Sequence, residues 1–234
     1  MKKMTLIQHF SEIKRRILWS LLLFVVFFAC GWYLAPSIQY ILTQPLLNVW
    51  ADGTMLYTSV TDGLMIQFEL AGLFAIIAIV PVVFWHVWAF VKPGLKESEQ
   101  NFIWPILILS PILFIAGALF VFYFLMPIVF KFFVELNNTG NVPNVFLPDA
   151  RGYLKFIIKM LKVFGVAFQL PLFMILLNKI GVLNREYVIK VRRYAIVLIV
   201  ILSAIITPPD VVSQLMLALP MCALFEISIL FMRK

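Results

Sequence analysis

The chain has 234 residues, of which 63% are hydrophobic and only 13% are charged, with a net formal charge of +8 and a mean hydropathy of +1.02. This usage argues against a soluble globular protein and is typical of integral membrane proteins. The positive charge needs no nucleic-acid partner, because membrane topology and contact with anionic lipids account for it.

Uncharged apolar runs predict six membrane-spanning helices. No run alternates as a barrel strand does, and backbone groups in lipid must be satisfied within the segment, so the spans are expected to be helical. The predicted fold is an all-α integral membrane protein with one six-helix transmembrane domain over residues 1–234. The spans lie at 17–35, 70–91, 102–130, 163–178, 194–207 and in a final arm that ends near Met232.

The segment TLIQHFSEIKRR precedes the first span. Thr5 and Gln8 form a capping box, and apolar residues follow at helical spacing, which predicts a short amphipathic helix at the membrane interface. A structural pair of Glu12 with Arg16 one turn later and a binding role for Glu12 both remain open. The run 17–35 is longer than the apolar part of a signal peptide and has no cleavage site, so it predicts an uncleaved anchor.

Residues 36–62 contain no Lys or Arg and carry turn signals at Gln44-Pro45 and Asp52-Gly53. They predict interfacial helices or a cap on the bundle. Between the second and third spans, FVKPGLKESEQNF has a Pro93-Gly94 turn and then Glu97 and Glu99. These carboxylates either complement the dipole of the next helix or serve as an exposed recognition site.

The fourth span carries a polar stripe. Lys155, Lys159, Lys162 and Gln169 recur at spacings that place them on one helical face. Either the lysines snorkel to the interface, or the stripe lines a water-accessible concavity of the bundle.

The segment ITPPDVVSQ divides the last apolar stretch into a hairpin. Pro208 and Pro209 remove two backbone donors and prevent one continuous helix. The first arm, 194–207, would be roughly 21 Å long against a hydrocarbon core of about 30 Å, so it is predicted to be short. Asp210 is expected to cap the final helix.

Basic residues predict the orientation of the chain. Six spans place the N-terminus, two loops and the C-terminus on one side of the membrane together with most of the Lys and Arg residues. Both termini are therefore expected in the cytoplasm. The basic residues of the other side are Lys131, Arg151, Lys155, Lys159 and Lys162. Cys30 and Cys222 lie in separate spans and are expected in the core rather than in a disulfide.

Motifs of the common hydrolase, metalloprotease and nucleotide-binding classes are missing from the sequence, and His9 and His86 lie in separate segments. We therefore expect no enzyme, no cofactor and no metal. A secondary solute transporter that uses Glu69, Asp210 or Glu226 and a purely structural scaffold remain as alternatives.

Four motifs occur in order along the chain: HFSEIKRR, FVKPGLKESE, VFGVAFQLP, and TPPDVVSQ followed by LALP and LFEI. Together they resemble the TatC family, the multispanning receptor subunit of the twin-arginine protein translocase. The resemblance implies a concave, glove-like bundle with short fifth and sixth helices that exports folded proteins across the bacterial cytoplasmic membrane or its organellar equivalent. It also implies a multimeric complex with TatA-type and TatB-type single-span subunits, membrane lipids, and signal peptides that carry paired arginines.

The resemblance also implies roles for individual residues. Glu12 and Glu99 match the glutamates that recognise the signal peptide, and two positions depart from the family pattern, Lys14 from an arginine and Gln169 from a glutamate. Lys14 keeps the charge but not the bidentate fork, and Gln169 cannot titrate. The implied groups are Glu12, Glu99, Lys14, Arg16 and Phe90 for signal-peptide binding, Pro45 and Asp210 for structure or gating, and Lys159, Lys162, Gln169, Gln214 and Glu226 for partner helices or the polar concavity.

Overall fold

The computed structural model describes residues 6–49, 54–91, 103–137, 147–207 and 210–233. Regular structure in these ranges is helical, apart from one isolated bridge between Leu56 and Asp149. The elements are α1 (Leu6–Leu47), α2 (Asp62–Val91), α4 (Ile103–Phe120), the π-helical turn η2 (Val121–Leu125), α5 (Met126–Asn137), α6 (Ala150–Ala167), α7 (Leu170–Lys179), α8 (Arg185–Ile206) and α9 (Val211–Phe231).

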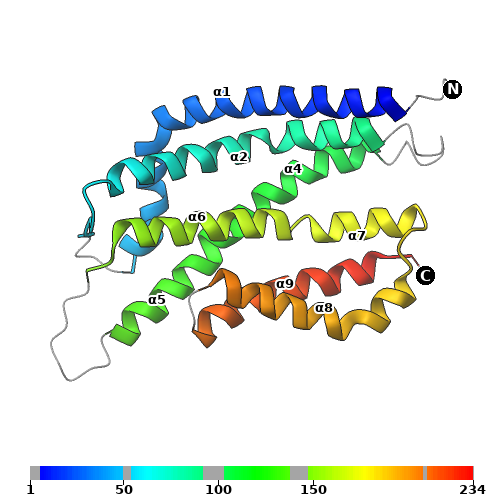
Figure 1. Cartoon of the computed structure of the whole chain (residues 1–234). Coiled ribbons are helices and arrows are strands. Elements are labelled where there is room, and N and C mark those ends of the chain that lie inside the picture. Colours follow the sequence, from blue (N-terminus) through cyan, green and yellow to red (C-terminus); the bar gives the residue numbers. More distant parts are fainter. Residues whose placement is uncertain (1–5, 50–53, 92–102, 138–146, 208–209, 234) are drawn as a thin grey trace.

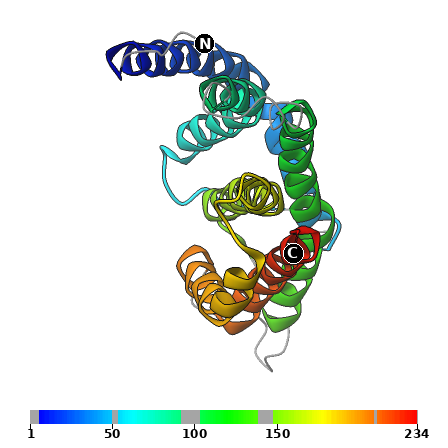
Figure 2. The same ribbon diagram turned by 90° about the vertical axis from the view of Figure 1, so that its right-hand side faces the viewer.

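The helices lie side by side in one bundle (Figure 1). Both termini lie at one end of this bundle, which we call the terminal end, and α5 ends and α6 begins at the opposite, far end. Viewed down the bundle in Figure 2, α1, α2, α4, α5, α9 and α8 follow an arc, and α6 and α7 lie inside it. This arrangement agrees with the predicted concave, all-helical fold.

Five stretches within the described residues are long and apolar enough to cross a membrane: 14–47, 62–87, 108–136, 150–179 and 211–231. Helix α8 is not among them, although it has 22 residues. Its first half carries Arg185, Glu186, Lys190, Arg192 and Arg193, so only the part from Tyr194 onward is continuously apolar.

Helix α1 is continuous over 42 residues and contains both Pro36 and Pro45. The predicted amphipathic segment before the first span is helical, but it is continuous with the span rather than a short helix of its own, and the predicted turn at Gln44-Pro45 is wrong. Figure 1 shows the last part of α1 bending away from its long first part. A proline inside a helix removes a donor and displaces the preceding turn, which explains a bend without a break.

Close backbone approaches hold neighbouring helices together. A Cβ atom on Gly31 of α1 would lie 2.8 Å from the carbonyl oxygen of Ala71 in α2. A Cβ atom on Gly117 of α4 would lie 2.5 Å from the carbonyl oxygen of Phe164 in α6. Only glycine permits these separations. The apolar core lies where the end of α1 meets α2, η2, α5 and α6, and includes Leu46, Ile66, Leu70, Met126, Leu154, Ile157 and Phe164.

The fourth span differs from the predicted 163–178. Helix α6 begins at Ala150 and ends at Ala167, and α7 begins at Leu170 after a short break. Pro171 explains the break, because its ring has no N–H to donate and would clash with the carbonyl one turn earlier. The lysines of the polar stripe therefore belong to the span rather than to its entrance.

The predicted hairpin is present, with different helix lengths. Helix α8 starts nine residues before the predicted 194, at Arg185, and ends at Ile206, while α9 spans 21 residues from Val211. The short apolar segment of the hairpin is therefore the second half of α8, whereas α9 is long enough to span. Pro208 and Pro209 lie outside the described residues.

Candidate functional site

Those residues implied for signal-peptide binding that the structure describes have their backbone near the terminal end of the bundle. Ser20 Oγ of α1 and His86 Nδ1 of α2 share a hydrogen bond of 2.8 Å, which fixes the register of these antiparallel helices. Glu12 lies two turns before Ser20, and Phe90 lies one turn after His86, so their backbone positions reach the same end. Glu99 lies outside the described residues, in the connection between α2 and α4.

Two implied cations, Lys14 and Arg16, are not brought together. They are two residues apart on α1, which places them about 200° apart around the helix. Arg16 is half-buried and close enough to His86 of α2 to interact with it electrostatically. Lys14 is exposed, on the side of α1 away from α2. A ligand at the α1–α2 junction would therefore contact Arg16 rather than Lys14.

Gln169 does not belong to an exposed polar stripe. It is 3% exposed, in the break between α6 and α7, and forms two hydrogen bonds with Ser110 of α4. Ser110 Oγ donates to Gln169 Oε1 over 2.7 Å, and Gln169 Nε2 donates to the Ser110 carbonyl over 2.9 Å. The prediction that Gln169 lines a water-accessible concavity is wrong. The break at Phe168, between α6 and α7, directs the Gln169 side chain toward α4, where it is buried.

The three lysines of the stripe lie along α6. Lys155 and Lys159 are exposed, and Lys162 is half-buried. Lys159 Nζ donates a hydrogen bond of 3.2 Å to the carbonyl of Ile205, at the end of α8. Carbonyls in the last turn of a helix have no partner within it and carry partial negative charge, so an ammonium group suits this position. Lys159 therefore links α6 to the hairpin.

The polar residues implied for the last helix bind within the hairpin. Asp210 Oδ1 accepts the Ser213 N–H over 2.7 Å, which confirms that Asp210 caps α9. Gln214 Nε2 donates to the Val200 carbonyl over 3.2 Å. Glu226 Oε1 lies 2.5 Å from Arg192 Nε and forms an ion pair with it. These contacts account for two of the acids on which a transporter would depend.

Pro45 is buried in the last turns of α1, close to the point where this helix meets α6. Tyr153 Oη of α6 donates a hydrogen bond of 2.9 Å to the carbonyl of Leu42. This contact supports a structural role for the Pro45 region, because it fixes the bent end of α1 against the start of α6.

Sequence reasoning missed a polar cluster at the far end. Asp62, at the start of α2, has a side chain only 2% exposed, and its Oδ1 accepts a bond of 3.2 Å from Arg151 Nη1 of α6. Its Oδ2 accepts the Ser59 N–H over 2.7 Å and the Thr58 hydroxyl over 3.1 Å. The sequence offered one signal, an acid at a helix start, but nothing that pairs it with a residue 89 positions later.

Two backbone bonds extend this cluster to a second connection. Leu56 N donates to the Pro148 carbonyl over 3.0 Å, and Ala150 N donates to the Leu56 carbonyl over 2.9 Å. Asp149 caps α6 by accepting the Gly152 N–H over 2.8 Å. Hydrogen bonds therefore connect the segment before α2 to the segment before α6. We call these residues, Leu56, Pro148, Asp149 and Ala150, together with Asp62 and Arg151, the far-end clamp.

Known proteins match the chain in sequence. The sequence model of the family described as "Sec-independent protein translocase protein (TatC)" matches residues 8–220. The Sec-independent protein translocase protein TatC of Rickettsia prowazekii is 35% identical, with 98% of this chain and 93% of that protein covered. TatC of Escherichia coli K12 is 34% identical, with 97% of this chain and 88% of that protein covered.

Solved structures match the fold. Two crystal structures of the twin-arginine translocase receptor TatC superpose on the chain, with TM-scores of 0.86 and 0.88. The first is 31% identical and covers 95% of this chain and 97% of its own, and the second is 30% identical and covers 97% and 100%. From these matches in sequence and in fold, we conclude that the chain belongs to the TatC family of Sec-independent protein translocase proteins.

Proposed function

We propose that this chain is the receptor that recognises signal peptides with paired arginines, and that Glu12 and Glu99 bind those arginines. Membership of the TatC family makes the chain a multi-pass membrane component of a protein translocase rather than an enzyme. The observation that carries the proposed site is the register of α1 and α2, set by the Ser20–His86 bond, which brings Glu12 to the end of α2 from which the Glu99 connection departs.

Charge supports this site. The terminal end is rich in Lys and Arg, including Lys14, Arg15, Arg16 and the first half of α8, so a peptide with two arginines is repelled over most of it. Carboxylates accept a guanidinium group through two parallel hydrogen bonds, which lysine cannot form. Recognition therefore depends on geometry as well as on charge.

The two carboxylates do not supply most of the affinity. Exposed ion pairs contribute about 0 to 1 kcal/mol each, so two of them cannot hold a folded cargo at the membrane. Burial of the apolar part of the signal peptide against the bundle contributes about 25 cal/mol for each Å² removed from water. The arginines set the register of the peptide, and its apolar segment supplies the binding energy.

The proposal extends to location and partners. The protein lies in the bacterial cytoplasmic membrane or its organellar equivalent. Because the basic residues concentrate at the terminal end, both termini face the cytoplasmic side of this membrane. TatA-type and TatB-type single-span subunits associate with the chain in a multimeric complex. Lys162 is a better candidate for a surface that partners meet than Lys159, Gln214 or Glu226, since these three already contact residues of the hairpin.

Site-specific photocrosslinking tests the recognition site. A photoreactive residue at position 99 should crosslink a signal peptide with paired arginines several-fold more than the same peptide with paired lysines. The double reversal Glu12→Lys with Glu99→Lys should abolish export while the protein still reaches the membrane. Glu186→Lys, a charge reversal at the start of α8 near the same end, is the matched control and should export normally. Equal crosslinking of both peptides, or export by the double reversal, would falsify the assignment.

A further inference from the structure

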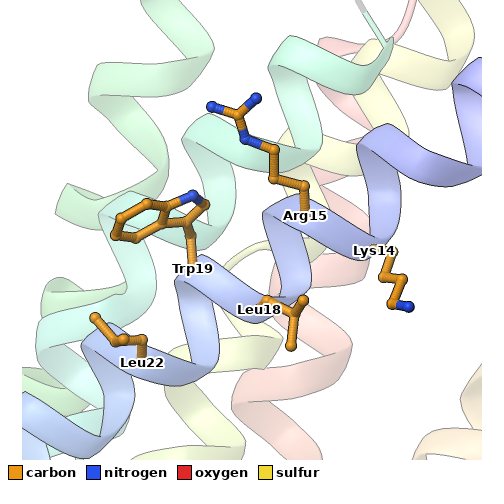
Figure 3. A pocket seen from close by; sticks show the side chains of 5 residues that line it. All are labelled: Lys14, Arg15, Leu18, Trp19 and Leu22. Atoms are coloured by element: carbon orange, nitrogen blue, oxygen red, sulfur yellow. The ribbon is translucent and has the colours of Figure 1, made fainter.

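A shallow groove of about 290 Å³ lies on α1 near the terminal end. Figure 3 shows its five lining side chains, Lys14, Arg15, Leu18, Trp19 and Leu22. All of its lining residues belong to α1, at the position along this helix where the sequence changes from charged to apolar. In a membrane-spanning helix, this change marks the boundary between the lipid headgroups and the hydrocarbon.

Helical spacing gives the groove two walls. Lys14, Leu18 and Leu22 form one row at intervals of four residues, and Arg15 and Trp19 form the adjacent row. In Figure 3, Arg15 and Trp19 project to one side of α1, whereas Lys14 projects to the other. Each wall thus begins with a cation at the terminal end and continues with apolar side chains toward the far end.

The groove faces away from the rest of the protein. Ser20, on the opposite side of α1, bonds with His86 of α2. Leu18, Trp19 and Leu22 are 54%, 52% and 54% exposed. Only 6% of the most apolar stretch of α1 is buried, against 33 to 39% for the other four spanning stretches. Among the described carboxylates, none pairs with Lys14 or Arg15.

We propose that this groove binds one anionic phospholipid. Its phosphate lies between the Lys14 ammonium and the Arg15 guanidinium, and one acyl chain follows Leu18 and Leu22 along the indole of Trp19. The eight helical steps from Lys14 to Leu22 rise about 12 Å, close to the depth of one leaflet of a hydrocarbon core about 30 Å thick. Tryptophan prefers this interfacial level, where its ring meets both acyl chains and headgroups.

The charges of Lys14 and Arg15 favour a lipid rather than a partner helix as the occupant of this groove. A helix packed into this groove would take both cations out of water unless it supplied carboxylates at the same height. A phospholipid leaves both cations at the interface and provides the phosphate oxygens that guanidinium and ammonium groups bind. A zwitterionic lipid presents its own ammonium group beside the phosphate, so a lipid with net negative charge fits two cations better.

Native mass spectrometry of the purified full-length protein tests the charge requirement. With equal amounts of phosphatidylglycerol and phosphatidylcholine, the protein should retain mainly phosphatidylglycerol. Retention should fall by about fivefold for each cation removed in Lys14→Gln and Arg15→Gln. Lys131→Gln, which removes an exposed cation of α5 near the far end, away from the groove, is the control and should bind as the original protein does. Unchanged retention in the Lys14→Gln, Arg15→Gln double variant would overturn the proposal.

Tryptophan fluorescence tests the position of the acyl chain. The signal lost in Trp19→Phe isolates Trp19 from the other tryptophans, and brominated phosphatidylglycerol should quench it at a lower mole fraction than brominated phosphatidylcholine. Equal quenching by both lipids would reduce the groove to general contact with the bilayer. Protection from both would mean that another protein segment covers it. Either result contradicts the proposal. Neither readout involves a signal peptide, so the two proposals fail independently.

Discussion

At the scale of single residues, the most informative pair is Ser110 with Gln169. Each satisfies the other, and both are almost fully buried. A buried polar group without a partner costs free energy, whereas removal of both partners together is far less harmful. In this chain, Gln169 therefore stabilises the α4 contact, at a position where the TatC family commonly has a glutamate.

Replacement of one partner should expose this dependence. Ser110→Ala or Gln169→Leu should each lower the free energy of unfolding by about 1 to 3 kcal/mol, because each leaves one buried group unsatisfied. The double variant should lose less than the sum of the two. Thermal unfolding in detergent measures all three. Additive losses would show that the two side chains act separately.

Gln169→Glu addresses the departure from the family directly. The carboxylate cannot donate to the Ser110 carbonyl as Nε2 does, so two oxygens would face each other. This variant belongs in the same unfolding series, where it should be less stable than the original protein.

At the scale of elements, the contact between α4 and α6 depends on the absence of a side chain at Gly117. Gly117→Ala should lower the free energy of unfolding by about 1 to 3 kcal/mol, since the new methyl group would meet the Phe164 backbone, which cannot move aside as a flexible side chain can. Gly63→Ala is the matched control on α2, where nothing lies within 4 Å of the new atom. It should be neutral or slightly stabilising, because alanine favours helix. Similar unfolding temperatures for the two variants would contradict the close approach.

Some helix boundaries could be predicted from the sequence, and others could not. The break between α8 and α9 and the capping by Asp210 depend on neighbouring residues, so both were predictable. The helix through Pro36 and Pro45 was not, because propensity predicts a stop and packing of the bent end against Tyr153 overrides it. The start of α8 at Arg185 was missed because hydropathy reports apolar length rather than helix length.

In the candidate site, too, one part could be predicted from the sequence and another could not. The end of the bundle at which Glu12 and Phe90 lie followed from motifs and span order. The burial of Gln169 did not, since its partner Ser110 lies 59 positions away and no local pattern connects them.

At the scale of the whole molecule, the far-end clamp joins segments that the chain order separates. Asp62 and Arg151 connect α2 to α6, and the Leu56 bridge adds two backbone bonds beside them. The clamp therefore closes the bundle at the far end. At the terminal end, Asn178 performs a similar task, because its Oδ1 accepts the Arg233 N–H over 2.7 Å.

Loss of the clamp should affect the whole bundle. Arg151→Gln should lower the free energy of unfolding by about 1.5 kcal/mol, near the lower limit for a hydrogen bond to a charged group, because Arg151 is 36% exposed and partly screened by solvent. Lys155→Gln, which neutralises an exposed cation one turn later on α6, is the control and should leave stability unchanged. Hydrogen exchange should show faster opening near Leu56 in Arg151→Gln only. Equal exchange in both variants would show that the Asp62–Arg151 pair does not hold this end.

The π-helical turn η2 determines which way the side chains of α5 point relative to those of α4 in the long helix that the two form. Within it, the Met126 N–H donates to the carbonyl of Val121, five residues earlier, so this turn holds one more residue than an α-helical turn. Each residue of an α-helix rotates the next by about 100°, so the extra residue resets the phase of everything that follows. Without that reset, the side that carries Gly117 toward α6 would continue into solvent or lipid, and Met126 and Phe130 would rotate out of the core. One additional residue in this turn thus keeps the buried side of α4 continuous with the buried side of α5.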